Sequence, residues 1–192
     1  IPEVIKNYTW KKSMKWSNYD LNWARPLKSI TALFNNKIVD FNFFHLHSGN
    51  LINIDGEKEE KVKKINNFKS YLSILKSKDI VLDHKKREEI VIKKINNICN
   101  ARKLKNNFNK KLNEEVINLV EKPNVILCKF DEIYLKVPQE ILIVTMQQHQ
   151  KYFPLFDNDG KLTNLFLLVA NMPDKKSYIK IGNQRVIEAR LS

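Results

Sequence analysis

The sequence contains few glycines, and none of them are clustered. Four glycines lie singly among 192 residues, at Gly49, Gly56, Gly160 and Gly182. A Rossmann fingerprint and a P-loop both need several glycines in one short loop, because the backbone must approach the phosphates of a nucleotide closely. We therefore expect no nucleotide chemistry at a glycine-rich loop.

Cysteine and long apolar runs are also scarce. Cys99 and Cys128 are the two cysteines, too few for a disulfide framework or a four-thiolate zinc site, so a reducing, cytoplasmic location is expected. No apolar run approaches the roughly 20 residues that span a bilayer, and no membrane partner is expected. Because the sequence begins at Ile1, without an initiator methionine or a signal-peptide pattern, we interpret it as cut from something longer.

Acidic residues are outnumbered by basic ones. Thirty-four Lys and Arg against 21 Asp and Glu give a net charge of +13, which predicts a polyanionic partner such as a nucleic acid. Seventeen Lys and Arg against seven Asp and Glu lie between Glu57 and Lys111, so this stretch alone carries +10. Two interpretations are open: these cations contact phosphates, or they form the solvated face of amphipathic helices.

The spacing of apolar residues predicts two β-hairpins. The apolar runs within residues 30–44 flank Asn35 and Asn36, which tolerate the left-handed conformations of a two-residue turn. The DNDG sequence at 157–160 separates two further apolar runs and predicts the second hairpin. Other short apolar runs predict strands at 80–82, 125–130 and 133–137.

Apolar residues at three- and four-residue spacing predict four amphipathic helices. These helices contain Ile65 to Leu75, Val91 to Cys99, Leu112 to Val120, and Ile141 to Met146. The last one is expected to have Pro138 in its first turn and to end before Tyr152. The predicted class is therefore α+β (mixed α/β), with antiparallel hairpins and a sheet packed against amphipathic helices.

Three parts of the chain are predicted from this order. Residues 1–56 are the hairpin-containing part of an α/β module, and residues 57–111 are a basic helical stretch. Residues 112–192 are the helix-strand-hairpin part of the same module and end at a truncated C-terminal helix. A hydrophobic content of 43% is sufficient for a sizeable core.

All three tryptophans lie near the beginning of the chain, at Trp10, Trp16 and Trp23. Cationic side chains are interleaved with them, at Lys11, Lys12, Lys15 and Arg25. Aromatic faces beside cations could stack on and attract a single-stranded nucleic acid. The other interpretation is packing in the core, which is the more frequent use of large aromatic side chains.

Histidines offer candidate sites that are chemically incomplete. His45 and His47 would point to the same side of a strand, as metal ligands can, but no third ligand lies near them in the sequence, so we expect no metal. His149 falls near the end of a predicted helix, where an imidazole could act as an acid, a base or a phosphate-binding cation.

Several strings of residues occur in the order found in one known family. They are KSMKW at 12–16, WARP at 23–26, EEVINLVEKP at 114–123, LKVPQEILIVTMQQHQKYFPLFDNDGKLTNLFLLVAN at 135–171 and GNQRVIEARL at 182–191. Almost end to end, the chain resembles the β subunit of bacterial heterotetrameric (α2β2) glycyl-tRNA synthetase, from its N-terminal half. It departs from that family in lacking a G-H-R-F element after Gly49 and in carrying Lys122 for Trp and Gln184 for Glu.

The resemblance implies an enzyme that joins glycine to tRNA(Gly) and uses ATP and Mg on a class II α subunit. The β subunit then binds tRNA and scaffolds the assembly, with the α subunit, tRNA(Gly) and a second β subunit as partners. No catalytic residue, metal or cofactor is expected in this chain. The resemblance extends to the B3/B4-type module of phenylalanyl-tRNA synthetase β chains, and an editing (deacylase) module using His149 is the alternative.

Two sets of candidate site residues follow. The cations proposed for tRNA binding are Lys12, Lys15, Arg25, Lys85, Lys86, Arg87, Lys93 and Lys94. The motif residues whose role the resemblance leaves open are Met146, His149, Gln150, Lys151, Tyr152, Phe153, Gly182, Asn183 and Arg190. A third hypothesis is purely structural: the helix around 146–153 packs against the rest of the β subunit or against α.

Overall fold

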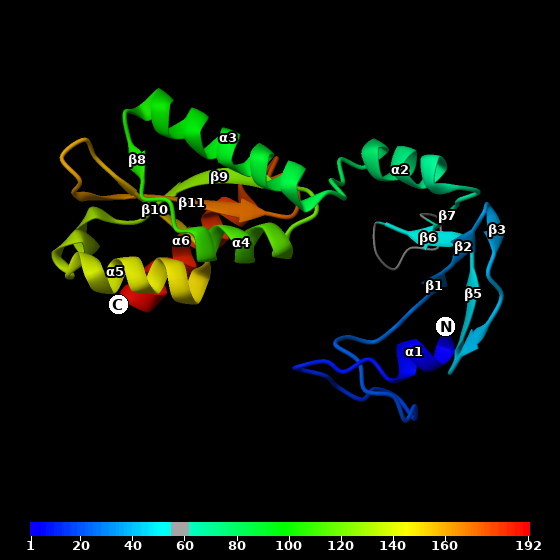
Figure 1. The fold of residues 1–192 in the computed structure, drawn as a ribbon. Coiled ribbons are helices and arrows are strands. Elements are labelled where there is room, and N and C mark those ends of the chain that lie inside the picture. Colours follow the sequence, from blue (N-terminus) through cyan, green and yellow to red (C-terminus); the bar gives the residue numbers. More distant parts are fainter. Residues whose placement is uncertain (55–61) are drawn as a thin grey trace. The chain divides into compact units, whose positions relative to one another are not determined.

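A computed structural model describes residues 1–54 and 62–192, and the chain divides into two compact units (Figure 1). Unit 1 is Ile1–Lys78 and unit 2 is Asp79–Ser192. This boundary lies inside the predicted basic stretch 57–111, whose first residues, 57–61, fall outside the described residues. Helices and strands are mixed in both units, which confirms the predicted α+β class.

Short strands dominate unit 1. Its elements are α1 (Pro2–Lys6), β1 (Ile30–Thr31), β2 (Leu33–Phe34), β3 (Lys37–Ile38), β4 (Asn42–Phe43), β5 (Leu46–Gly49), β6 (Leu51–Asn53), β7 (Val62–Lys64) and α2 (Phe68–Ser77). A three-stranded sheet has the order β1–β5–β4, with β1 parallel and β4 antiparallel to β5. Two antiparallel pairs, β2–β3 and β6–β7, complete the strands described in this unit.

The first predicted hairpin is confirmed between β2 and β3. Asn35 and Asn36 both have positive φ angles, 48° and 62°, as the two-residue turn requires. The strands are shorter than the predicted segment, because β4 pairs with β5 instead of extending this hairpin. The predicted helix that follows is α2, which begins at Phe68 because the Asn67 and Ser70 side chains form a capping box.

Unit 2 contains one four-stranded sheet. Its elements are α3 (His84–Arg102), β8 (Lys105–Asn106), α4 (Lys110–Leu119), β9 (Asn124–Lys129), η2 (Glu132–Lys136), α5 (Gln139–Val144), η3 (Thr145–Gln150), β10 (Phe153–Phe156), β11 (Leu162–Ala170) and α6 (Tyr178–Leu191). The strand order is β8–β10–β11–β9, and every neighbouring pair is antiparallel. The long central strand β11 therefore organises the unit.

Both faces of this sheet are covered. A hydrophobic cluster containing Met146 and Phe166 packs with α5, η3 and α6, and a second cluster containing Val91 and Leu167 packs with α3 and α4. Phe166 and Leu167 are adjacent on β11 and belong to opposite clusters, because successive side chains of a strand point to opposite faces. Unit 2 is thus a sheet between two helical layers.

Most of the elements predicted for unit 2 are confirmed. The predicted helices correspond to α3, α4 and the continuous α5–η3 segment, and the predicted strand at 125–130 corresponds to β9. The second hairpin joins β10 to β11: Gly160 has φ 80° in its turn, and the Lys161 amide donates to the Asp157 carboxylate (2.8 Å). Among the described helices, none is both long and apolar enough to cross a membrane.

Two predicted strands are wrong. Residues 80–82 form an irregular link to α3, where the Val81 amide donates to the Glu121 carbonyl (2.9 Å) but no strand ladder forms. Residues 133–136 belong to η2, a 3₁₀ helix. The Asp131 side chain accepts from the Ile133 amide (3.0 Å), and this local bond starts a turn where the alternating apolar pattern predicted an extended segment.

Candidate functional site

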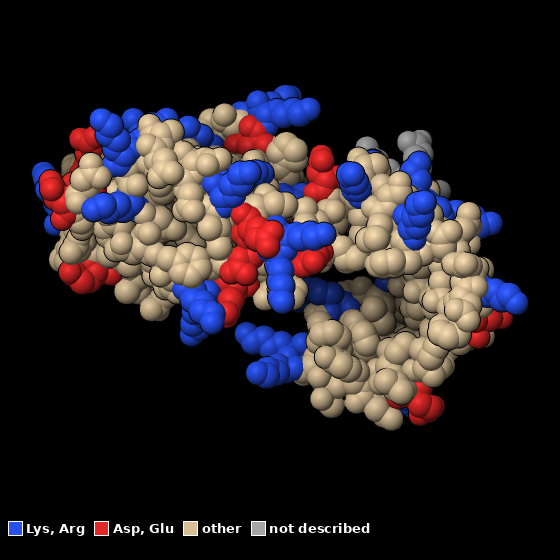
Figure 2. All heavy atoms as spheres, turned by 45° about the horizontal axis from the view of Figure 1, so that its top comes forward, with Lys and Arg blue, Asp and Glu red and all other residues tan. Residues whose placement is uncertain are grey.

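Helix α3 is the longest helix in unit 2 and carries five of the cations proposed for tRNA binding. Its N-terminus is fixed by the Asp83 carboxylate, which accepts from the Lys85 (2.9 Å) and Lys86 (3.4 Å) amides; these bonds lower the pKa of Asp83. The apolar residues Val91 and Ile95 are buried against the sheet, so the charged positions lie toward the outside. Figure 2, in which the top of Figure 1 comes forward, shows Lys and Arg in blue over this surface.

Two of the five cations proposed on α3 are engaged inside unit 2. The guanidinium of Arg87 donates from Nη1 to the carbonyls of Ile117 (3.1 Å) and Val120 (2.5 Å) at the end of α4. The ammonium of Lys94 donates to the carbonyl of Pro123 (2.9 Å). Helix ends leave carbonyls without helical partners, and cations stabilise them. Arg87 and Lys94 therefore join α3 to the segment that follows α4.

The other three cations on α3 remain open to an external ligand. Lys85, Lys86 and Lys93 are exposed, and their side chains form no hydrogen bond or ion pair with any residue in the described part of the chain. Helical spacing puts Lys86 and Lys93 two turns apart on one side of α3. We call these three residues the α3 lysine patch.

The cations proposed near the beginning of the chain are exposed in unit 1. Lys15 forms an ion pair with Asp20 (2.6 Å), and this hydrogen bond lowers the pKa of the Asp20 carboxyl. Arg25 makes one long contact, to the Ala24 carbonyl (3.4 Å), and Lys12 is exposed. Lys12 and Arg25 are therefore available to phosphates, whereas Lys15 is already paired with Asp20.

The three tryptophans form two separate aromatic groups. The Trp10 ring packs against the rings of Tyr8 (4.8 Å between centroids) and Trp23 (5.1 Å). In the second group, Trp16 lies near Tyr19 (6.5 Å). Because the rings mainly contact one another, they hold the long N-terminal segment together rather than form one continuous platform.

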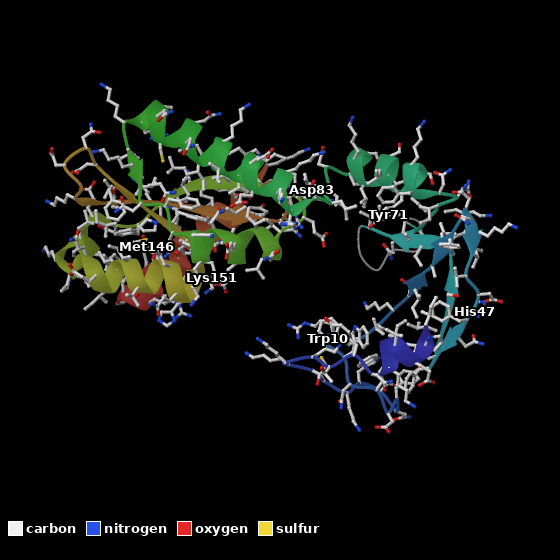
Figure 3. The ribbon with its side chains drawn as sticks, viewed as in Figure 1. Trp10, His47, Tyr71, Asp83, Met146 and Lys151 are labelled. Atoms are coloured by element: carbon white, nitrogen blue, oxygen red, sulfur yellow. The ribbon has the colours of Figure 1, made fainter. Side chains whose placement is uncertain are left out.

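The two histidines predicted to share one face of a strand do not do so. His47 lies in β5, and its ring nitrogens lie near the Asn42 amide oxygen (2.8 Å) and the Asp40 carboxylate (2.9 Å) (Figure 3). His45 lies in the preceding turn and stacks on Tyr19, with 3.9 Å between ring centroids. Within residues 1–54 and 62–192, no group of three His, Cys, Asp or Glu side chains could hold a metal ion.

The motif residues around 146–153 lie where η3, a π-helical turn, leads into β10. Met146, Tyr152 and Phe153 are buried in the core, and Figure 3 labels Met146 on this helix. Lys151 ends the turn with a left-handed φ of 60°, which redirects the chain into the strand. His149 is exposed and has no hydrogen bond or ion pair with a described residue.

The structure brings the two best motifs together through two side-chain pairs. The Tyr152 hydroxyl donates to the Asn183 amide oxygen (2.6 Å). The Gln150 amide oxygen, when turned toward α6, accepts from Arg190 Nε (2.6 Å) and Nη2 (3.1 Å). We call Gln150, Tyr152, Asn183 and Arg190 the motif clip. Burial raises the pKa of Tyr152 to about 12, so its hydroxyl remains a donor at neutral pH. Gly182 is exposed on α6 beside the clip.

A polar cavity of about 450 Å³ lies between the start of α4 and η3. The Asn109 amide donates to Gln147 Oε1 (3.1 Å) on one side, and Lys151 forms an ion pair with Glu115 (2.9 Å) on the other. Sequence reasoning missed Asn109, Gln147 and Glu115. Glu115 and Gln147 lie within two of the quoted family strings, and Asn109 stands before an apolar repeat, a position typical of a helix cap.

Comparison with known proteins gives one consistent result. A family model described as glycyl-tRNA synthetase beta subunit matches residues 1–192. The chain is 37% identical to the glycine–tRNA ligase beta subunit of Rickettsia peacockii (strain Rustic) and 35% identical to that of Clostridioides difficile (strain 630), each over 193 residues. These alignments cover 100% of the chain but span only 29% and 28% of the lengths of the relatives.

Proposed function

Because the chain belongs to the glycyl-tRNA synthetase beta subunit family, we propose that it forms part of a β subunit that binds tRNA(Gly) and scaffolds the synthetase. In this proposal, glycine is joined to tRNA(Gly) with ATP and Mg, and the adenylate forms on a class II α subunit. Two α and two β subunits assemble in the cytoplasm. This chain contributes tRNA contacts and packing surfaces, and no catalytic residue.

The α3 lysine patch is the observation that carries the tRNA-binding part of the proposal. Lys85, Lys86 and Lys93 are exposed cations whose side chains form no hydrogen bond or ion pair with a described residue, on a helix whose other face is buried. Lysines in this setting attract phosphates without reading sequence. A rigid helix also keeps them at fixed spacing, which favours a defined backbone contact over diffuse attraction.

The motif clip supports the scaffolding part. Its four side chains join the end of η3 and the start of β10 to helix α6, and the buried Met146 and Ile187 pack in the cluster beneath it. A hydrogen-bonded pair next to a filled core restricts motion of both elements. The motif residues thereby hold the shape of unit 2.

The test uses the complete enzyme with full-length β and α subunits. Changing Lys85, Lys86 and Lys93 together to Gln should weaken tRNA(Gly) binding and flatten its dependence on salt, because each lost phosphate contact removes about 0.7–0.9 from the slope of log K against log salt. Binding is measured by fluorescence anisotropy of labelled tRNA at roughly 50–300 mM salt, a range in which salt screens exposed charges only partly.

Two controls separate binding from folding. The triple Lys→Arg variant keeps the charge and should keep both affinity and slope. Arg87→Gln and Lys94→Gln should destabilise unit 2, because carbonyls of Ile117, Val120 and Pro123 lose donors. An unchanged salt slope in the triple Lys→Gln variant would show that the α3 lysine patch does not bind tRNA.

A further inference from the structure

Unit 1 contains a concave site whose residues belong neither to the α3 lysine patch nor to the motif clip. Its volume is about 440 Å³, within the range of pockets that hold small organic groups. The β2–β3 hairpin, β6 and the start of α2 supply its walls, and every lining residue belongs to unit 1. Figure 3 labels Tyr71, which comes from α2.

Apolar side chains form most of the lining. Leu33, Ile52 and the buried Ile65 contribute aliphatic surface, while Phe68 and Tyr71 contribute rings from one side of α2. The two ring centroids are 6.2 Å apart and the planes are tilted by 38°, so the rings do not stack face to face. Phe68 is 66% exposed, which leaves its ring open to a ligand.

Free amides stand beside this aromatic surface. Asn35 and Asn36 occupy the left-handed turn of the hairpin and line the cavity. Among the described residues, neither side-chain amide has a hydrogen-bond partner, whereas Asn67 is occupied in capping α2. An amide offers both a donor and an acceptor, which matches the hydrogen-bonding edge of a nucleobase.

Among the described residues that directly adjoin a lining residue in the sequence, the charged ones are all lysines. Lys37, Lys64 and Lys69 each adjoin a lining residue in the sequence and are exposed. None of the three pairs with a carboxylate in the part of the chain that the structure describes. A ring for stacking, an amide for a base edge and lysines for phosphates are the three elements that single-stranded nucleic acids require.

We propose that this cavity, which we call the hairpin pocket, binds one unpaired nucleotide of RNA, with its base on Phe68 and its edge toward Asn35 and Asn36. This inference rests on the proposed tRNA-binding function and assigns it a second contact in unit 1. The α3 lysine patch attracts any duplex backbone, whereas the hairpin pocket requires a base that is free of pairing.

The central experiment replaces Phe68 in the full-length β subunit assembled with α. Phe68→Ala should weaken tRNA(Gly) binding about tenfold, the effect of losing one stacked base. Stacking releases no counterions, so the salt slope should remain unchanged, in contrast to the Lys→Gln variant of the α3 lysine patch. Phe68→Tyr keeps an aromatic face and should bind like the unmodified enzyme.

Phe34→Ala is the matched control. Phe34 lies in the β2–β3 hairpin and is 71% exposed, about as exposed as Phe68, but it does not line the pocket. It should leave tRNA affinity unchanged. Asn36→Gly keeps the left-handed turn accessible, removes the amide, and should weaken binding by a smaller factor than Phe68→Ala. Equal affinities of the Phe68→Ala, Phe34→Ala and unmodified enzymes would overturn the proposal.

A photocrosslinking amino acid at position 68 identifies the occupant directly. Crosslinks to unpaired nucleotides of tRNA(Gly) are expected. Crosslinks only to the α subunit or to another part of the β subunit would overturn the proposal and identify a protein-docking site. If the triple Lys→Gln variant of the α3 lysine patch loses tRNA affinity and Phe68→Ala does not, only the proposal for the hairpin pocket is wrong. If Phe68→Ala loses affinity and the triple variant does not, only the proposal for the α3 lysine patch is wrong.

Discussion

Among the described residues, unit 1 buries four hydrophobic side chains and leaves twelve large ones exposed, whereas unit 2 buries twenty and leaves eleven exposed. The two units have similar fractions of apolar residues available but use them differently. In unit 2 the long strand β11 places apolar side chains on both faces, and helices cover each face. Strands of two to four residues in unit 1 cannot organise such layers.

The difference indicates different roles. A filled core gives unit 2 its own stability, whereas exposed apolar surface is characteristic of regions that contact other molecules. We therefore interpret unit 2 as the rigid part of this chain and unit 1 as a part whose aromatic surface serves contacts.

The strongest test of this comparison removes one aromatic ring from each unit. Phe166 is fully buried, with its ring centroid 4.7 Å from that of Tyr152, whereas Phe34 is 71% exposed. Phe166→Ala should lower the free energy of unfolding of unit 2 by about 3–5 kcal/mol. Phe34→Ala should cost less than about 0.5 kcal/mol. Native-state hydrogen exchange in the full-length β subunit, read at β9–β11 and at β5, measures both; comparable losses would refute the contrast.

An intermediate effect is expected at the motif clip. Tyr152→Phe removes the donor to Asn183 and should cost about 1–2 kcal/mol. In the unmodified protein, burial holds the pKa of Tyr152 near 12, against 10.0 for an ordinary tyrosine. Stability from the protonated hydroxyl is therefore complete below pH 10 and is lost as the pH rises toward 12.

The measurement compares unfolding of the two proteins across that window. The difference between unmodified protein and Tyr152→Phe should be constant from pH 7 to about 10 and should shrink above it. Asn183→Ala serves as the partner variant, since it removes the acceptor and leaves the ring in place. A difference that stays constant up to pH 12 would show that the hydroxyl is not buried with Asn183.

Local chemistry explains which parts of the fold could be predicted. Asn35 and Asn36 determine their turn within two residues, and the apolar repeat of α3 identifies its buried side without any partner. The strand predicted at 133–137 failed because the alternation of apolar residues there competes with the cap from Asp131. A single side-chain acceptor outweighed the periodicity, which is weak over five residues.

The candidate site was less predictable, because it depends on contacts between distant residues. Gln150 and Arg190 are forty residues apart in the sequence, with β10 and β11 between them. The α3 cations could be found from composition. A helical charge pattern does not distinguish Lys94, which donates to a carbonyl, from Lys93, which has no hydrogen bond or ion pair with a described residue. The difference depends on where the Pro123 carbonyl lies in the folded chain, which the helix sequence does not specify.

The smallest expected effects concern two ion pairs of similar length, one in each unit. Lys15–Asp20 (2.6 Å) is mostly exposed, whereas Lys151–Glu115 (2.9 Å) is about two-thirds covered on the lysine side and stands at the end of η3. Lys15→Gln should leave stability unchanged, because solvent screens the pair. Lys151→Gln should cost about 0.5–1 kcal/mol, since the covered pair also anchors the left-handed turn. High salt should lower the stability of the unmodified protein toward that of the Lys151→Gln variant, because salt screens the ion pair. If Lys15→Gln lowered stability as much as Lys151→Gln does, unit 1 would be held more rigidly than its sparse core implies.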